Sequence, residues 1–147
     1  MKKRIFVFIL AVLTVLAVCA QTTSAAVVSK TEIVPRWGNT TECRTGFNIT
    51  TSGIGHVYVS YTGNSNFSYT KVTVEIQKRF LGLFWKTVEI GYTDDQWIGY
   101  CYDMVGSVSN SFALEDTGTY RANFTIEIIG NDGSVDTIED QIECKYS

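Results

Sequence analysis

Strict alternation of apolar and polar residues runs through most of this 147-residue chain and constrains its fold more than any other feature. Residues 120–128 show it best, with the apolar members Tyr120, Ala122, Phe124, Ile126 and Ile128. A period of two places these side chains on one face of a β-strand, and no window of helical length shows the 3.6-residue period of an amphipathic helix. The sequence therefore predicts an all-β protein.

Similar alternating segments recur along the chain between turn sequences. Ser52-Gly53-Ile54-Gly55 and Gly130-Asn131-Asp132-Gly133 are two such turns, because Gly and Asn tolerate positive φ. About seven or eight strands at this spacing are typical of an antiparallel β-sandwich. The segments that we expect to form strands are 47–50, 56–61, 70–79, 86–91, 96–102, 105–114, 120–128 and 134–146.

The segment from Asp116 to Tyr120 refines the predicted architecture. Its sequence Asp-Thr-Gly-Thr-Tyr resembles the immunoglobulin-type segment at the entry to strand F, where the tyrosine forms the tyrosine corner. The resemblance implies an immunoglobulin-like β-sandwich, with Tyr120 as the corner tyrosine and Asp116 as a turn residue. Ala122 stands where antibody domains carry a cysteine, and no Trp lies on 70–78, so their inter-sheet disulfide and its Trp partner are missing.

Residues 1–26 have the layout of a secretory signal peptide. A basic start at residues 2–4 precedes an apolar run of 16 residues from Ile5 to Ala20. This run is shorter than the ~20 residues of a membrane span, so we expect no transmembrane anchor. Cleavage after Ala20 or after Ala26 fits the small residues there, and we favour Ala26. A lipobox-like sequence ends at Cys19, but Val18 stands where a small residue is usual.

Cleavage after Ala26 changes the composition that enters the fold. It removes three of the 12 basic residues and none of the 15 acidic ones, which leaves a single domain at 27–147 with a net charge of −6. An acidic chain lacks the basic face that binds nucleic acid. We therefore expect a secreted domain whose partner is an extracellular protein, a glycan or a cell-surface ligand.

Three cysteines remain after cleavage, so one is left over when two pair. Cys43 and Cys144 share the alternation of their apolar neighbours and should point inward, so we favour a Cys43–Cys144 disulfide, with Cys43–Cys101 as the next choice. The leftover cysteine could link two copies into a dimer. The cysteines lack the His partner or CxxC spacing of a redox, catalytic or zinc site, and we predict no metal and no cofactor.

A second resemblance rests on the segment Val34-Pro35-Arg36-Trp37-Gly38-Asn39-Thr40 and on the later sequence Trp85-Lys86-Thr87-Val88. This combination resembles a group of small exported proteins of Gram-positive bacteria that begin with a P-R-W-x-N-T-like segment. The resemblance implies a small secreted β-sandwich with no known activity. From the residues alone, we expect Trp37 to close one end of the sandwich.

The segment 80–85 is the strongest candidate binding site. A loop between two strands should be polar, but this one is almost wholly apolar and has the basic neighbours Lys78, Arg79 and Lys86. Two interpretations are open: an exposed tip that docks on a membrane or a partner, or a loop whose Leu83 and Phe84 fold back and plug the sandwich. The apolar residues concerned are Phe80, Leu81, Leu83, Phe84 and Trp85.

Other candidates for chemistry are weaker. The acidic residues, which include Glu115, Asp116 and Asp136, do not follow a calcium-loop pattern, so we interpret them as a solvated face. His56, the sole histidine, sits on the outward side of its strand, without a nucleophile motif. The numerous tyrosines could stack on sugars or contact a protein. Four N-x-[ST] sequons, at Asn39, Asn48, Asn66 and Asn123, should be unused in a bacterium.

The sequence thus favours a non-enzymatic binding or structural module with an immunoglobulin-like fold. A secreted effector that engages a membrane or a host protein through 80–85 is the alternative. A small hydrolase that uses surface carboxylates ranks last, because no catalytic constellation is visible.

Overall fold

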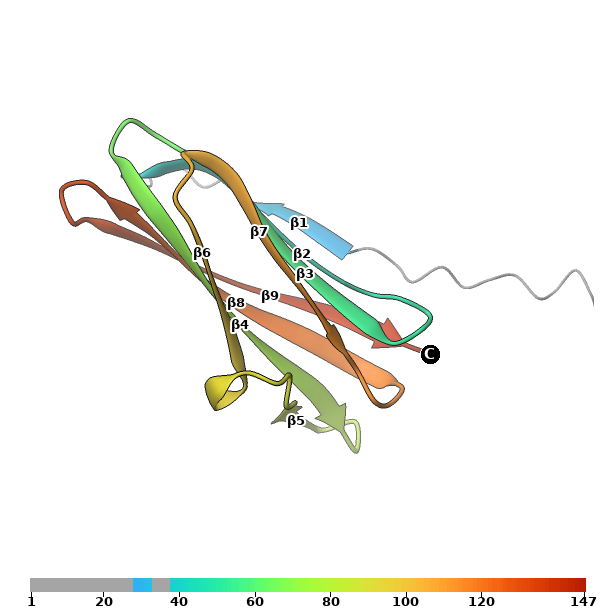
Figure 1. Ribbon diagram of the computed structural model, residues 1–147. Coiled ribbons are helices and arrows are strands. Elements are labelled where there is room, and N and C mark those ends of the chain that lie inside the picture. Colours follow the sequence, from blue (N-terminus) through green and yellow to red (C-terminus); the bar gives the residue numbers. More distant parts are fainter. Residues whose placement is uncertain (1–27, 33–37) are drawn as a thin grey trace, which may run out of the picture.

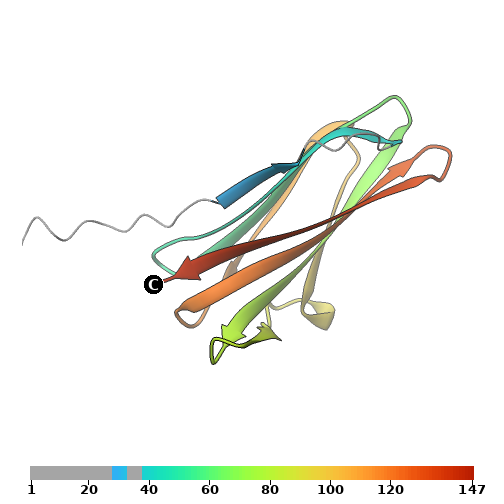
Figure 2. The ribbon, with the colours of Figure 1, turned by 180° about the vertical axis from the view of Figure 1, so that it is seen from behind.

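The computed structural model describes residues 28–32 and 38–147. These residues form two antiparallel β-sheets that face each other, and a short 3-10 turn at Thr93–Asp95 joins two strands (Figures 1 and 2). The predicted all-β sandwich is therefore confirmed. The predicted signal peptide and Trp37 lie outside the described residues, as does most of the P-R-W segment. Among the described residues, no helix is long and apolar enough to cross a membrane.

The two sheets share the nine strands of the described residues. The first sheet has the order β1-β2-β3-β7, and the second has the order β5-β4-β8-β9. Strand β6 pairs with β4 along the edge that β5 also uses, farther from the tip of β4. The bounds are β1 Val28–Glu32, β2 Thr40–Ile49, β3 Ile54–Gly63, β4 Phe67–Phe80, β5 Phe84–Thr87, β6 Gln96–Cys101, β7 Val105–Ala113, β8 Gly118–Gly130 and β9 Val135–Tyr146.

Alternation along β4 and β8 builds the centre of the core. Val72 lies opposite Ile126, and Val74 opposite Phe124, in the register of the two strands. These four side chains are buried and belong to the same core cluster as residues from the first sheet. Burial of apolar area is the main favourable term in folding, so the alternating pattern itself dictates which faces meet. The core residues of the first sheet include Phe47, Val57 and Val59.

Tyr120 makes the contact that a tyrosine corner requires. The residue is 2% exposed, and its hydroxyl donates a hydrogen bond of 2.6 Å to the backbone carbonyl of Asp116. The bond ties the start of β8 to the loop that leads into it. The immunoglobulin-like type of the sandwich stays a prediction that this contact supports.

A buried asparagine joins the two sheets at the opposite end. Asn39 is 0% exposed, and its amide donates to the carbonyls of Ile128 and Ser134, both at 3.2 Å. Its side-chain oxygen accepts from the Asn66 amide at 2.8 Å and from the Ser134 hydroxyl. An N-linked glycan on Asn39 would have to replace these bonds in a closed space, so this sequon is incompatible with modification of the folded protein.

Asp132 and Asp136 extend this polar network. Hydrogen bonds from Ser134 and Asn66 hold the pKa of Asp132 at about 2, below its ordinary value of 3.8. The carboxylate of Asp136 accepts from the backbone amides of Gly38 and Asn39. The carboxylates of Asp132 and Asp136 therefore hold nearby backbone segments in place. The interpretation of the acidic residues as a solvated face did not predict this role.

The favoured Cys43–Cys144 disulfide is not formed in this arrangement of strands. In the described part of the chain no disulfide is formed, and strands β2 and β9 run side by side in the same direction, as the contacts Asn39–Asp136 and Thr45–Asp140 show. Measured from these contacts, Cys43 and Cys144 are out of step by four to six residues, roughly 13–20 Å at about 3.3 Å per residue. A disulfide needs Cα atoms within about 7 Å.

The alternative pair Cys43–Cys101 is not formed either. Cys101 lies on β6, which belongs to the second sheet, and its thiol is next to the hydroxyl of Tyr61. Tyr61 is also the register partner of Cys43 on the neighbouring strand, so the tyrosine stands between the two cysteines. Cys101 is half-buried, and a dimer linked through it stays a prediction.

Replacing Asn39 should weaken the fold through the lost network. We expect Asn39→Ala to lower the free energy of unfolding by about 2–3 kcal/mol, because buried carbonyls lose their donors. The outward-facing Asn48→Ala, on the strand β2 that follows Asn39, should change it by about 0.5 kcal/mol or less. Urea unfolding of both variants measures the difference, and equal losses would contradict the role of Asn39.

High pH should destabilise the protein through its buried tyrosines. Burial raises the pKa of Tyr61 and of Tyr120 above the ordinary 10.0, and the Cys101 thiol adds to the effect at Tyr61. Below pH 10 both tyrosines are protonated in either state. Above it the unfolded chain ionises first and binds fewer protons, so the free energy of unfolding falls with pH. Thermal unfolding between pH 8 and about 11 should show this fall, and an equally steep fall in Tyr61→Phe/Tyr120→Phe would exclude these groups as its cause.

Candidate functional site

The candidate site is the hairpin of β4 and β5, which extends past the body of the sandwich (Figure 1). Phe80 lies opposite Phe84, and the amide of Leu83 donates to the carbonyl of Phe80 at 3.1 Å. We call the residues 80–84 the apolar tip. Because β4 is the longest strand of the structure, its end carries the apolar tip beyond the strands that cover the core.

The apolar tip is exposed. Phe80, Leu81, Leu83 and Phe84 are 57%, 75%, 76% and 63% accessible to solvent. The interpretation in which Leu83 and Phe84 fold back to plug the sandwich is therefore wrong. The core needs no plug at this end, because Ile76, Ile90 and Leu114 are buried in the core cluster. A contiguous apolar group of this kind on a protein surface marks an interaction site more often than scattered single residues do.

The turn at the apolar tip is strained. Leu81 has φ of 51° and Gly82 has φ of 70°, which is the sign pattern of a type I′ turn. Such turns prefer Asn-Gly or Asp-Gly, because positive φ is unfavourable for a bulky aliphatic residue. The chain thus keeps a leucine at a position where asparagine would fold better. Strain of this kind clusters at functional sites.

Two arginines hold Trp85 at the base of the apolar tip. The guanidinium of Arg79 lies 5.0 Å from the centre of the ring, and that of Arg121 lies 4.3 Å from it. Both distances are within the range of a cation–π contact. Arg79 and Trp85 are register partners, whereas Arg121 comes from β8. These neighbours leave Trp85 half-buried, whereas Leu81 and Leu83 are exposed.

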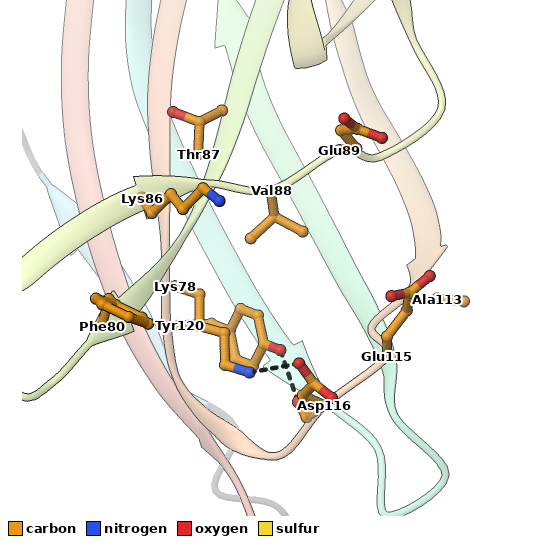
Figure 3. A pocket seen from close by; sticks show the side chains of 10 residues that line it. All are labelled: Lys78, Phe80, Lys86, Thr87, Val88, Glu89, Ala113, Glu115, Asp116 and Tyr120. Atoms are coloured by element: carbon orange, nitrogen blue, oxygen red, sulfur yellow. Dashed lines mark hydrogen bonds and ion pairs between the residues drawn. The ribbon is translucent and has the colours of Figure 1, made fainter.

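A cleft of about 340 Å³ lies behind the apolar tip, at the open end between the sheets (Figure 3). The ammonium of Lys78 contacts the Asp116 carboxylate at 3.0 Å and lies 5.6 Å from the centre of the Tyr120 ring. Burial is the largest single influence on the pKa of Lys78 and lowers it, but the hydrogen bond to Asp116 and the interactions with Tyr120 and the Asp116 charge together outweigh it, so the pKa is raised. The other lining residues are Phe80, Lys86, Thr87, Val88, Glu89, Ala113 and Glu115.

The cleft has mixed charge. Its two lysines face three carboxylates, and Asp116 is engaged by Lys78. A general acid or base needs a pKa near the working pH, whereas the Lys78 pKa is moved upward, away from neutrality. Asp116 therefore lies here as the ion-pair partner of Lys78, and Glu115 lines the same cleft.

His56 makes one contact of chemical interest elsewhere. Its Nδ1 lies 2.6 Å from the hydroxyl oxygen of Ser111, its register partner on β7. The pair sits on the solvent-facing side of the first sheet, and neither residue lines a cleft described above. Within the described residues, no group of three or more His, Cys, Asp or Glu side chains could hold a metal ion.

A second exposed patch lies on the outer face of the second sheet. The Tyr69 ring lies 6.5 Å from that of Tyr100 and 5.8 Å from that of Tyr102, centre to centre. Tyr69 is also the register partner of Ile129. This patch brings together three of the tyrosines that the sequence marked, but their rings are tilted by 35–41° and do not form a flat platform.

Sequence reasoning found the apolar tip but missed the parts that come from other strands. Arg121 and the Lys78–Asp116 pair enter the site because β4 and β8 pair in one particular register. Of the residues that line the cleft, Asp116 and Tyr120 are marked in the sequence by the motif that they bound. No local signal marks Arg121, which lies 36 residues after Trp85 in the sequence.

No protein-family model and no curated protein matches the chain. Among solved structures, the chain is similar to the ApaA protein from Bordetella pertussis, with a TM-score of 0.35 and 10% sequence identity. The match covers 86% of this chain and 98% of that one. A likeness at this level carries no argument about fold or activity.

The strained turn predicts that a substitution at the apolar tip will stabilise the protein. Leu81→Asn should raise the free energy of unfolding by about 1 kcal/mol, because asparagine tolerates positive φ far better than leucine. Urea unfolding measures the change. Leu83→Asn, at a neighbouring exposed position outside the pair with positive φ, is the matched control and should be neutral within about 0.5 kcal/mol. A loss of stability in Leu81→Asn would contradict the strain.

Proposed function

We propose that this chain is a secreted, non-enzymatic binding module with an immunoglobulin-like β-sandwich, and that the apolar tip is its binding element. The observation that carries the proposal is the exposure of four large apolar side chains on a strained hairpin turn. Both features are unfavourable for a protein that stays alone in water. The apolar exposure becomes favourable when a partner covers the apolar tip.

The rigidity of the hairpin supports this role. A binding element that is already ordered loses less conformational entropy when it binds. The β4–β5 pairing and the two arginines on Trp85 fix the base of the apolar tip, and the core of the sandwich anchors β4. The binding side chains are thus presented on a rigid scaffold.

The strand order supports the immunoglobulin-like type. In such domains strand F lies between C and G, and strand B lies between A and E. Here β8 lies between β4 and β9, and β3 lies between β2 and β7. The Tyr120–Asp116 hydrogen bond occurs at the entry to β8, where strand F begins in that scheme. Secretion rests on the sequence of residues 1–26.

The proposal predicts that the apolar tip controls attachment to cells. Labelled protein should bind intact bacterial or animal cells. Leu81→Asn/Leu83→Asn should reduce the bound fraction about tenfold or more, because the variant loses two leucines that the partner would bury on binding. Flow cytometry measures this.

Ile98→Asn is the matched control, because Ile98 is an exposed apolar residue on β6, away from the apolar tip. It should bind like the wild type. Equal binding of the wild type and the apolar-tip variant would refute the apolar tip as the binding element.

A further inference from the structure

We infer that the partner of the apolar tip is an anionic lipid surface, into which the hairpin inserts. This inference rests on the function proposed above and names its ligand class. Two further observations carry it: where the basic residues lie, and the order of side chains along the hairpin.

Positive charge is concentrated on the hairpin of an otherwise acidic protein. From Gln77 to Thr87 the chain contains three basic residues and no acidic one, and Arg121 lies beside them on β8. The charges elsewhere at 38–147 are mostly negative, so an anionic surface would attract the hairpin and repel the rest of the molecule. The basic residues at 38–147 are Arg44, Lys71, Lys78, Arg79, Lys86, Arg121 and Lys145.

The order of side chains along the hairpin matches the layers of a membrane interface. Leu81 and Leu83 are outermost, Phe80 and Phe84 follow, and the level of Trp85 and Arg79 comes next. Lys78 and Lys86 are register partners one residue farther from the tip. At about 3.3 Å per residue, the apolar part spans roughly 7–10 Å, close to the 5–10 Å depth that interfacial elements reach. Trp and basic residues then lie at the level where lipid headgroups begin.

The chemistry of the apolar tip favours lipid over a protein groove. Its four side chains are two leucines and two phenylalanines, none of which carries a hydrogen-bonding group. A stable protein interface buries about 800 Å² per partner across some 20–30 residues and includes a polar rim. The hairpin is only two strands wide, and the charged residues next to the apolar tip along it are cationic. The apolar tip can therefore contact lipid chains while these cations contact the phosphate groups.

The acidic neighbours limit how deep the hairpin can enter. Asp116 neutralises Lys78, and Glu89 and Glu115 line the cleft behind the apolar tip. These carboxylates would be repelled by anionic headgroups, so insertion should stop at the level of Lys78 and Lys86. The same repulsion favours a tip-first orientation.

The test is cosedimentation with vesicles of phosphatidylcholine mixed with phosphatidylglycerol, compared with vesicles of phosphatidylcholine alone. The wild type should bind the anionic vesicles, bind the neutral ones at least about tenfold more weakly, and dissociate as salt is added. Failure of the wild type to bind anionic vesicles would overturn the inference, as would equal binding to both kinds.

The variants separate insertion from charge and from unfolding. Leu81→Asn should weaken vesicle binding although it stabilises the fold, so its loss of binding cannot come from unfolding. Arg79→Gln/Lys86→Gln should reduce binding to anionic vesicles by a larger factor than it reduces the weak binding to neutral ones. Ile98→Asn should bind like the wild type. Retained anionic binding in Leu81→Asn/Leu83→Asn would overturn the inserted hairpin.

Comparison with the cell-binding experiment shows which proposal fails. Attachment to cells that depends on the apolar tip, without binding to vesicles, would overturn the lipid partner and leave the binding module intact. Attachment that is independent of the apolar tip would refute the proposed function itself.

Discussion

The pairing of β4 with β8 is the constraint on which the rest of the structure depends. One face of this pair carries Val74 and Phe124 into the core, and the other face carries Arg121 to the side of Trp85. Side chains in a strand alternate between faces, so a shift of the register by one residue would exchange the two sets. The same register therefore fixes both the core and the support of the apolar tip.

The two ends of the sandwich are held in different ways. At one end, buried Asn39 and its partners join the sheets with satisfied hydrogen bonds. At the other end, Tyr120 and Lys78 line an open cleft, and β4 continues outward to the apolar tip. The hydrogen-bonded end fixes the relative positions of the strands, because a buried polar network in which every group is satisfied specifies one arrangement. The open end is then free to carry an exposed hairpin.

Stability and binding are opposed at the apolar tip. Leu81 occupies a backbone conformation that asparagine would adopt with less strain, and its side chain remains in water. Natural proteins are commonly less stable than their fold permits, and the deficit often lies where function needs an unfavourable group. In this protein the apolar tip and the strained Leu81 lie together on one hairpin, outside the alternating core that supplies the stability.

The sequence by itself determined the all-β class, most of the strands and the apolar segment 80–85, because alternation and turn residues are local properties of the chain. Only the tertiary structure decided the exposure of Leu83, the position of Arg121 on Trp85 and the separation of Cys43 from Cys144. These depend on how strands distant in sequence are aligned. Two inward-facing cysteines satisfy the same pattern whether they meet or lie at different heights, and only the contacts between β2 and β9 settle that alignment.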